Sequence, residues 1–128
     1  MSEQNEMDKT PGIISWNELM TRDAAASTKF YSGLFGWTHE EMDMGGATYT
    51  VFKTGERSVA GMIKYPPDAE SMPVMWMNYI TVTNLEASVA KAGELGGKVL
   101  KDVTAMSMGR FAIVRDPQGA VFGLWQFA

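Results

Sequence analysis

The sequence predicts an α+β fold in which two tandem βαβββ modules form a cup-shaped mixed sheet with the helices outside. Two observations predict it. One is that both halves have the same order of strand and helix patterns. The other is an internal repeat, whose identical residue pairs are Asn17/Asn78, Ala26/Ala87, Ser27/Ser88, Leu34/Leu95 and Gly36/Gly97. A long repeat that occurs only twice indicates one supersecondary unit duplicated and closed on itself, because a solenoid needs three or more repeats.

Length and composition indicate one domain. The chain has 128 residues, of which 45% are hydrophobic and 20% charged, as is usual for a globular domain of this size. Residues 1–12 are predicted to be a flexible N-terminal arm, because their start is polar and acidic with no apolar run. The single domain would cover residues 13–128, with copy one at 13–65, a proline-rich linker at 66–74 and copy two at 75–128.

Copy one starts with a strand pattern over residues 13–21. Asp23 is a good N-cap for a helix over residues 24–34, and Gly36 can take the left-handed conformation that ends a helix. Short alternating runs bounded by turn residues then predict three more strands, at residues 37–42, 48–52 and 58–64.

Copy two repeats this order. After a strand that carries Met77, Tyr79 and Thr81, Asn84 caps a helix over residues 85–95. Asp116-Pro117-Gln118-Gly119 is typical of a type I turn, with Asp, Pro and Gly at their preferred positions. The three later strands are predicted at residues 98–104, 110–114 and 120–127.

Four motifs occur along this order of elements: Leu19-x-x-x-Asp23, Phe30-Tyr31-x-x-Leu34-Phe35-Gly36-Trp37, Leu95-Gly96-Gly97 and Phe111-x-x-x-Arg115-Asp116-Pro117-Gln118-Gly119. With these motifs the chain resembles the vicinal oxygen chelate superfamily, which includes glyoxalase I, extradiol dioxygenases and the fosfomycin- and bleomycin-resistance proteins. The resemblance extends from about residue 13 to the end, and the glyoxalase-like branch is the most similar.

The resemblance implies a metal site that this chain lacks. Metal-using members hold a divalent ion with His or Glu at four cup-facing positions, on the first and last strand of each copy. The equivalent positions here are Trp16, Gly61, Met77 and Gly123, and none has a side chain that ligates a hard cation. A shift of one residue gives Asn17, Met62, Asn78 and Leu124, which is no better. We therefore expect no metal and no other cofactor.

A triad on one strand and a single glutamate are the other polar candidates for a functional site. His39, Glu41 and Asp43 alternate on one strand, but neighbouring positions on that face are about 7 Å apart, too far for one ion. We interpret them as a solvated face. Glu18 shares the face of Trp16, and a carboxylate among apolar walls would have a raised pKa, so it is the candidate general acid or base. Its alternative role is a rim or dimer-contact carboxylate paired with a cation.

Alternation along the strands places mostly apolar and aromatic residues, and few polar ones, on the inner face of the predicted cup. Ligand pockets commonly have this composition. The predicted ligand-binding residues are Trp16, Met20, Met77, Tyr79, Thr81 and Trp125. Gly61 and Gly123 would leave room beside them. Two alternatives remain for this surface: a filled core, or the interface of a homodimer.

The preferred function is metal-independent binding of a small apolar or aromatic ligand. One alternative is a metal-dependent lyase, isomerase or dioxygenase of the same superfamily, and another is a non-catalytic interaction module with a filled cup. Whether the chain is an enzyme stays open. The net charge of −4, with scattered Lys and Arg, argues against nucleic-acid or membrane partners. The absence of cysteine and of an apolar leader fits a cytoplasmic protein.

Overall fold

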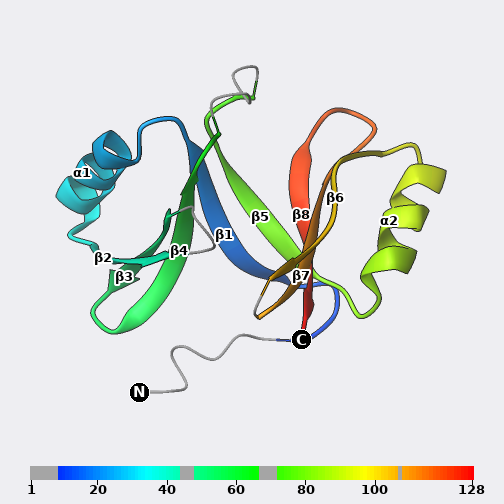
Figure 1. Cartoon of the computed structure of the whole chain (residues 1–128), viewed down its shortest axis with the longest axis horizontal. Coiled ribbons are helices and arrows are strands. Elements are labelled where there is room, and N and C mark those ends of the chain that lie inside the picture. Colours follow the sequence, from blue (N-terminus) through cyan, green and yellow to red (C-terminus); the bar gives the residue numbers. More distant parts are fainter. Residues whose placement is uncertain (1–8, 44–47, 67–71, 107) are drawn as a thin grey trace. The chain divides into compact units, whose positions relative to one another are not determined.

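The computed structural model describes residues 9–43, 48–66, 72–106 and 108–128. The chain divides into two compact units, which we call module 1 and module 2 (Figure 1). Module 1 is Trp16–Trp76, and module 2 combines Met77–Ala128 with the described residues 9–15. Most of the expected N-terminal arm, residues 1–8, lies outside the described residues.

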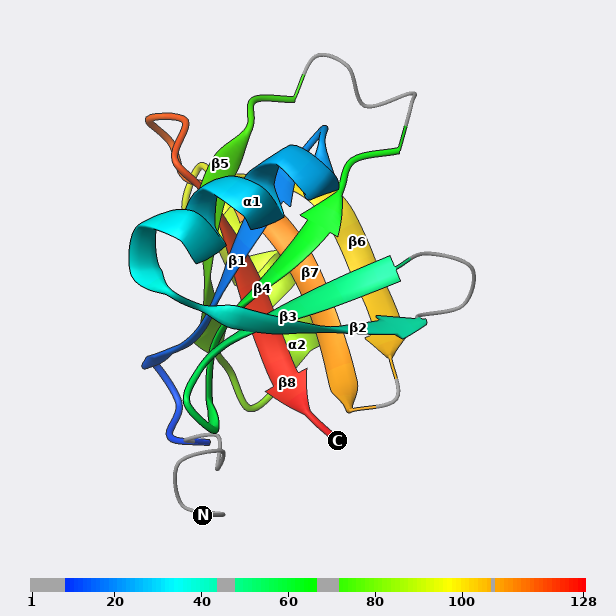
Figure 2. The same ribbon diagram turned by 90° about the vertical axis from the view of Figure 1, so that its left-hand side faces the viewer.

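Module 1 contains the elements predicted for copy one. Its strand order is β2-β3-β4-β1, with β1 parallel to β4 and the other pairs antiparallel, so the sheet is mixed. Figure 2 shows α1 lying over one face of these strands. The elements are β1 (Ile14–Thr21), α1 (Ala24–Phe35), β2 (Thr38–Asp43), β3 (Thr48–Thr54) and β4 (Arg57–Lys64).

Module 2 repeats this arrangement with strand order β5-β8-β7-β6, in which β5 is parallel to β8. Its elements are β5 (Met75–Thr81), α2 (Leu85–Glu94), β6 (Lys98–Met106), β7 (Gly109–Arg115) and β8 (Val121–Phe127). The predicted fold class is confirmed, and every predicted boundary lies within two residues of the observed one.

The predicted helix caps explain why the boundaries agree. The Asp23 carboxylate accepts a hydrogen bond from the Ala26 backbone N–H at 3.0 Å, and Asn84 does the same for Ala87. At the other end of α1, Gly36 has φ of 72°, a left-handed conformation that costs other residues steric strain.

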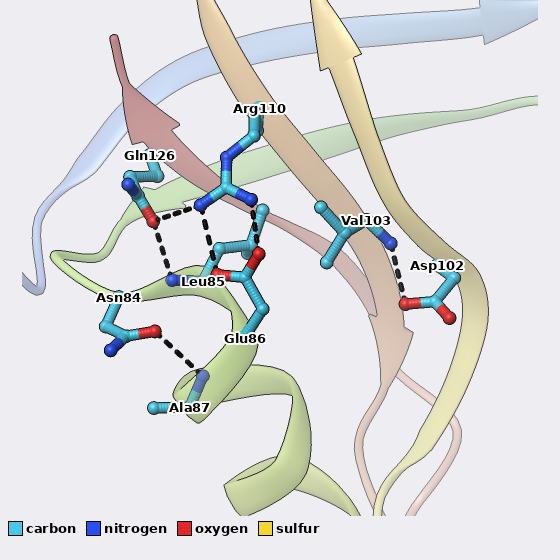
Figure 3. Close-up of polar contacts among 8 residues, drawn as sticks. All are labelled: Asn84, Leu85, Glu86, Ala87, Asp102, Val103, Arg110 and Gln126. Carbon is cyan, nitrogen blue, oxygen red and sulfur yellow. Dashed lines mark hydrogen bonds and ion pairs between the residues drawn. The ribbon is translucent and has the colours of Figure 1, made fainter.

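A polar cluster fixes the start of α2 (Figure 3). The Gln126 side-chain oxygen accepts from the Leu85 backbone N–H at 2.7 Å and from the Arg110 guanidinium at 3.1 Å. Arg110 also forms an ion pair with Glu86, and this hydrogen bonding lowers the pKa of the Glu86 carboxyl. Strand β8 is therefore bonded to the first turn of the helix that covers it.

Each module has its own hydrophobic core between its helix and one sheet face. The core of module 1 consists of Leu19, Phe52, Ala60 and Met62. The core of module 2 consists of Leu85, Ala112, Val114 and Leu124. Because side chains alternate along a strand, the neighbours of these residues point to the other face. We call that other surface the helix-free face of each module.

Residues 9–13, at the start of the described chain, are joined to β5 and β8 within module 2. The Gly12 backbone N–H donates to the Thr81 carbonyl at 2.8 Å, and the Thr81 N–H donates to the Ile13 carbonyl at 3.0 Å. The Lys9 ammonium lies 5.5 Å from the centre of the Phe127 ring. Among the described residues, no helix is both long and apolar enough to cross a bilayer.

Candidate functional site

The strand register of module 1 places the predicted site residues of the first copy on the helix-free face. Glu18 on β1 stands opposite Gly61 on β4, and Met20 stands opposite Ile63. Trp16 shares this face by alternation. The predicted grouping of Trp16, Glu18 and Met20 thus agrees with the observed register.

Tyr49 on β3 fills the space above Gly61. A β-carbon on Gly61 would overlap the Tyr49 hydroxyl and would lie 3.0 Å from the Trp16 indole nitrogen. The indole N–H of Trp16 donates a hydrogen bond of 2.8 Å to that hydroxyl. The space beside Gly61 in module 1 is therefore filled by a hydrogen-bonded Tyr–Trp pair.

Glu18 extends this pair into a chain of three groups. Its side chain is buried, with 7% of its surface exposed, and the Tyr49 hydroxyl hydrogen-bonds to it. Burial, followed by the negative charge of Glu18, raises the pKa of Tyr49 well above its ordinary value of 10.0, although the Trp16 hydrogen bond opposes this. Tyr49 is therefore a neutral donor to the carboxylate at neutral pH.

Module 2 has an aromatic ring in the equivalent place, but from a different strand. Tyr79 on β5 stands opposite Gly123 on β8, and a β-carbon on Gly123 would overlap the Tyr79 ring. Phe111, the counterpart of Tyr49 in the repeat, packs edge-on against Tyr79, with ring centres 6.2 Å apart. Met77, farther along the same face, is 1% exposed.

Two polar groups on the helix-free face of module 2 have no partner. The Trp125 indole nitrogen and the Thr81 hydroxyl are buried without a hydrogen bond in the structure as described. Thr81 and Trp125 are register partners on β5 and β8, so they are neighbours across the sheet. A buried polar group without a partner is uncommon and calls for an explanation, such as a water, an ion or a ligand.

The four positions that the resemblance equates with metal ligands, Trp16, Gly61, Met77 and Gly123, offer an indole, a thioether and two glycines. Among the residues that the structure describes, no group of three or more His, Cys, Asp or Glu side chains is placed to hold a metal ion. His39, Glu41 and Asp43 are exposed along β2, and the pairing of His39 with the core residue Phe52 puts them on the helix side.

Sequence reasoning missed Tyr49 and Phe111. The predicted inner face contains only residues of the first and last strand of each copy, whereas Tyr49 and Phe111 lie on the third strand. Both fall on the helix-free face, because Tyr49 pairs with Ile63 and Phe111 with Trp125. The signal was present in the sequence, since an aromatic residue occurs at this repeat position in both copies.

The family model that matches residues 13–124 describes the glyoxalase/bleomycin resistance protein/dioxygenase superfamily. Two curated relatives are similar. The provisionally named glyoxylase CFP32 of Mycobacterium tuberculosis is 36% identical over 88% of this chain and 43% of its own length. The anthracycline biosynthesis protein DnrV of Streptomyces peucetius is 33% identical over 91% of this chain and 47% of its own. The chain thus spans less than half the length of either relative.

A solved structure supports the fold. Methylmalonyl-CoA epimerase from Mycobacterium tuberculosis matches with a TM-score of 0.62 at 10% identity, over 98% of this chain and 95% of that one. At this identity the likeness concerns the fold alone.

Proposed function

Because the chain belongs to the glyoxalase/bleomycin resistance protein/dioxygenase superfamily, we propose that it is a metal-independent binding member of it. Its ligand would be a small, flat aromatic molecule that carries an oxygen acceptor. The site would be the helix-free face of module 2, with Tyr79, Thr81 and Trp125 as its main contacts and Met77 as part of the wall.

Metal independence is supported by the chemistry of the donor positions. A hard divalent cation binds carboxylate or imidazole groups that converge on one point. Gly61 and Gly123 have no side chain, and the spaces above them are occupied by Tyr49 and Tyr79. Placing a metal-binding side chain at either glycine would require a tyrosine ring to move.

The observation that carries the proposal is the unpartnered pair, Thr81 and Trp125. Leaving a buried polar group unsatisfied costs about 1–3 kcal/mol. A carbonyl or hydroxyl oxygen of a ligand that accepts from the indole N–H and the threonine hydroxyl would remove both costs. Such a ligand would need to displace the protein atoms that cover these two groups.

The surroundings of the pair favour an aromatic ligand. Tyr79 and Phe111 form one edge-on ring pair, and Trp125 and Phe127 form another, with ring centres 5.8 Å apart. A flat ring can pack against such walls with little loss of side-chain freedom. The relative named for anthracycline biosynthesis supports this choice, because an anthracycline is a fused-ring aromatic compound with several oxygen acceptors.

The test is a titration of the protein with the anthracycline doxorubicin, in which isothermal calorimetry measures binding in the presence of a chelator. Thr81→Val keeps the side-chain shape and removes the hydroxyl donor, and Trp125→Phe keeps an aromatic ring, although a smaller one, and removes the indole N–H donor. We expect each to weaken binding about tenfold, the effect of one lost hydrogen bond. Trp76→Phe is the matched control and should bind like the wild type. Trp76 lies at the start of β5 but falls within module 1, where its ring packs edge-on against Tyr31 of α1.

Two results would contradict the proposal. One is the absence of saturable binding of doxorubicin and of simpler hydroxyquinones. The other is binding that disappears with chelator and returns with a divalent ion, which would favour the metal-dependent enzyme instead.

A second candidate function rests on Glu18. A buried carboxylate hydrogen-bonded to a tyrosine is a suitable group for proton transfer, as in an isomerase. The assay is turnover of the methylglyoxal–glutathione hemithioacetal, with and without added Ni²⁺ or Zn²⁺. Glu18→Gln should abolish any activity while Trp125→Phe leaves it, and no turnover under either condition would exclude this reaction.

A further inference from the structure

A pocket of about 780 Å³ lies on the helix side of module 1, away from the helix-free face. Its volume is in the range of small-molecule sites. Its roof is the first part of α1, where Ala24, Ala25, Thr28 and Lys29 share one side of the helix. Figure 2 shows this end of α1 near the end of β4. The floor and walls are His39, Glu41, Thr48, Thr50, Met62, Lys64 and Tyr65.

The internal repeat explains why the pocket exists. The N-caps Asp23 and Asn84 are equivalent, so the first helical residues after them, Ala24 and Leu85, are equivalent too. Leu85 is completely buried in the core of module 2. Ala24 has a much smaller side chain, and α1 contributes no buried residue to its sheet.

One helical turn later the same contrast recurs. Val89 packs against the core of module 2, while its counterpart Thr28 lines the pocket of module 1. Module 1 is thus the same unit with two apolar core residues of the helix replaced by smaller or more polar ones. Ala24 still packs against the core of module 1, and the pocket lies beside Ala24 and Thr28.

The strand register shows how the floor is built. Glu41 on β2, Thr50 on β3 and Met62 on β4 form one row across the sheet, because Thr50 pairs with both of the others. Thr50 and Met62 are buried at 3% and 1% exposure. The pocket therefore has an apolar centre at Met62, a hydroxyl beside it and charged groups at its margin.

The charges favour an anionic ligand. Among the lining residues that the structure describes, Lys29 on α1 and Lys64 at the end of β4 are positive, and Glu41 is the single negative group. With His39 neutral, these described residues have a net charge of +1, in a chain whose net charge is −4. A ligand with one carboxylate group would balance this charge, and the apolar part of that ligand would lie on Met62 and the two alanines.

We propose that this pocket between α1 and strands β2–β4 is a second binding site, which takes a small carboxylate with an apolar body. It is separate from the site of the proposed function, because it lies on the opposite face of its sheet and in the other module. Tyr65 forms one wall, and its hydroxyl is bonded to the Pro73 carbonyl at 2.8 Å, so that wall is held in place.

The experiment is a titration of ¹⁵N-labelled protein with benzoate, read from backbone amide shifts. We expect saturable shifts in the first turns of α1 and in β3, with a Kd on the order of 1 mM for so small a ligand. Ala25→Phe should block the pocket and weaken binding at least tenfold. Ala26→Phe is the matched control, since Ala26 is the neighbouring exposed alanine and does not line the pocket.

Charge is tested separately. Lys29→Gln should weaken benzoate binding about two- to fivefold, the usual worth of a partly exposed ion pair. Lys91→Gln on α2 should leave it unchanged, and Trp125→Phe should also leave it unchanged. Equal binding of the neutral isostere benzamide, shifts that appear outside the pocket, or an unaltered Kd in Ala25→Phe would each overturn the proposal.

Discussion

The Tyr49 hydroxyl occupies the position that the β-carbon of any other residue at Gly61 would take. This relationship links two observations that look separate in the sequence. The resemblance to metal-using members of the superfamily implies a metal ligand at the position of the glycine, and the tyrosine on the neighbouring strand β3 occupies the space there. The same hydroxyl receives the Trp16 indole N–H and bonds to Glu18.

Adding one methyl group at this position tests the relationship. Gly61→Ala should destabilise the protein by about 1–3 kcal/mol, because Tyr49 has to leave a packed position. Gly33→Ala is the matched control, since nothing lies within 4 Å of a β-carbon there and alanine favours the helix by about 1 kcal/mol. Urea unfolding measures both, and a Gly61→Ala variant as stable as the wild type would contradict this packing of Tyr49 against Gly61.

Removing the Tyr49 hydroxyl should change how stability depends on pH. The pKa of Tyr49 is higher in the folded protein than its value of 10.0 in the unfolded chain. The contribution of the protonated hydroxyl to folding stability is therefore complete below about pH 10 and is lost as the pH rises above that value. Tyr49→Phe should lose about 1–2 kcal/mol at neutral pH through the missing hydrogen bonds. Above pH 10 its unfolding free energy should fall less steeply than that of the wild type.

The control for this effect is Tyr31→Phe, whose hydroxyl accepts from Trp76 near the surface of module 1. Chemical unfolding across the alkaline range separates the two variants. Parallel stability curves for the wild type and Tyr49→Phe would show that Tyr49 does not titrate as argued.

Giving module 1 the residue that module 2 has at the start of its helix should fill the pocket beneath α1. Ala24→Leu places the counterpart of Leu85 beneath α1, and burying the added groups should stabilise the protein by about 1–2 kcal/mol. Ala26→Leu, on the exposed side, should change stability by less than about 0.5 kcal/mol. Thermal unfolding compares the two, and a destabilised Ala24→Leu would mean that the space does not accept a leucine.

The Gln126 cluster makes a prediction about α2. Gln126→Ala leaves the Leu85 backbone N–H without its acceptor and should cost about 1–2 kcal/mol. Faster hydrogen exchange should be confined to the first turn of α2 and the adjoining part of β8. Gln118→Ala, in the exposed turn after β7, should alter neither, and a uniform rise in exchange over module 2 would argue against a local role.

Much of the candidate site was predictable, because it depends on alternation along a strand. Trp16 and Glu18, like Tyr79 and Thr81, are two residues apart, so their shared face followed from the sequence. The occupants of the space above Gly61 and Gly123 were not predictable. Tyr49 comes from a neighbouring strand in module 1, whereas Tyr79 comes from a parallel partner strand in module 2. The spaces above the two equivalent glycines are thus filled by tyrosines from non-equivalent strands.

The sequence by itself determined the two βαβββ modules, their helix limits and the face on which each predicted residue lies. These depend on N-caps such as Asp23, on turns and on periodicity, which act within a few residues. Only the tertiary structure decided that Tyr49 covers Gly61, that Thr81 and Trp125 stand unpartnered side by side, and that Ala24 leaves a pocket. Those features depend on strand register and on the volumes of side chains far apart in the chain, and local sequence preferences specify neither.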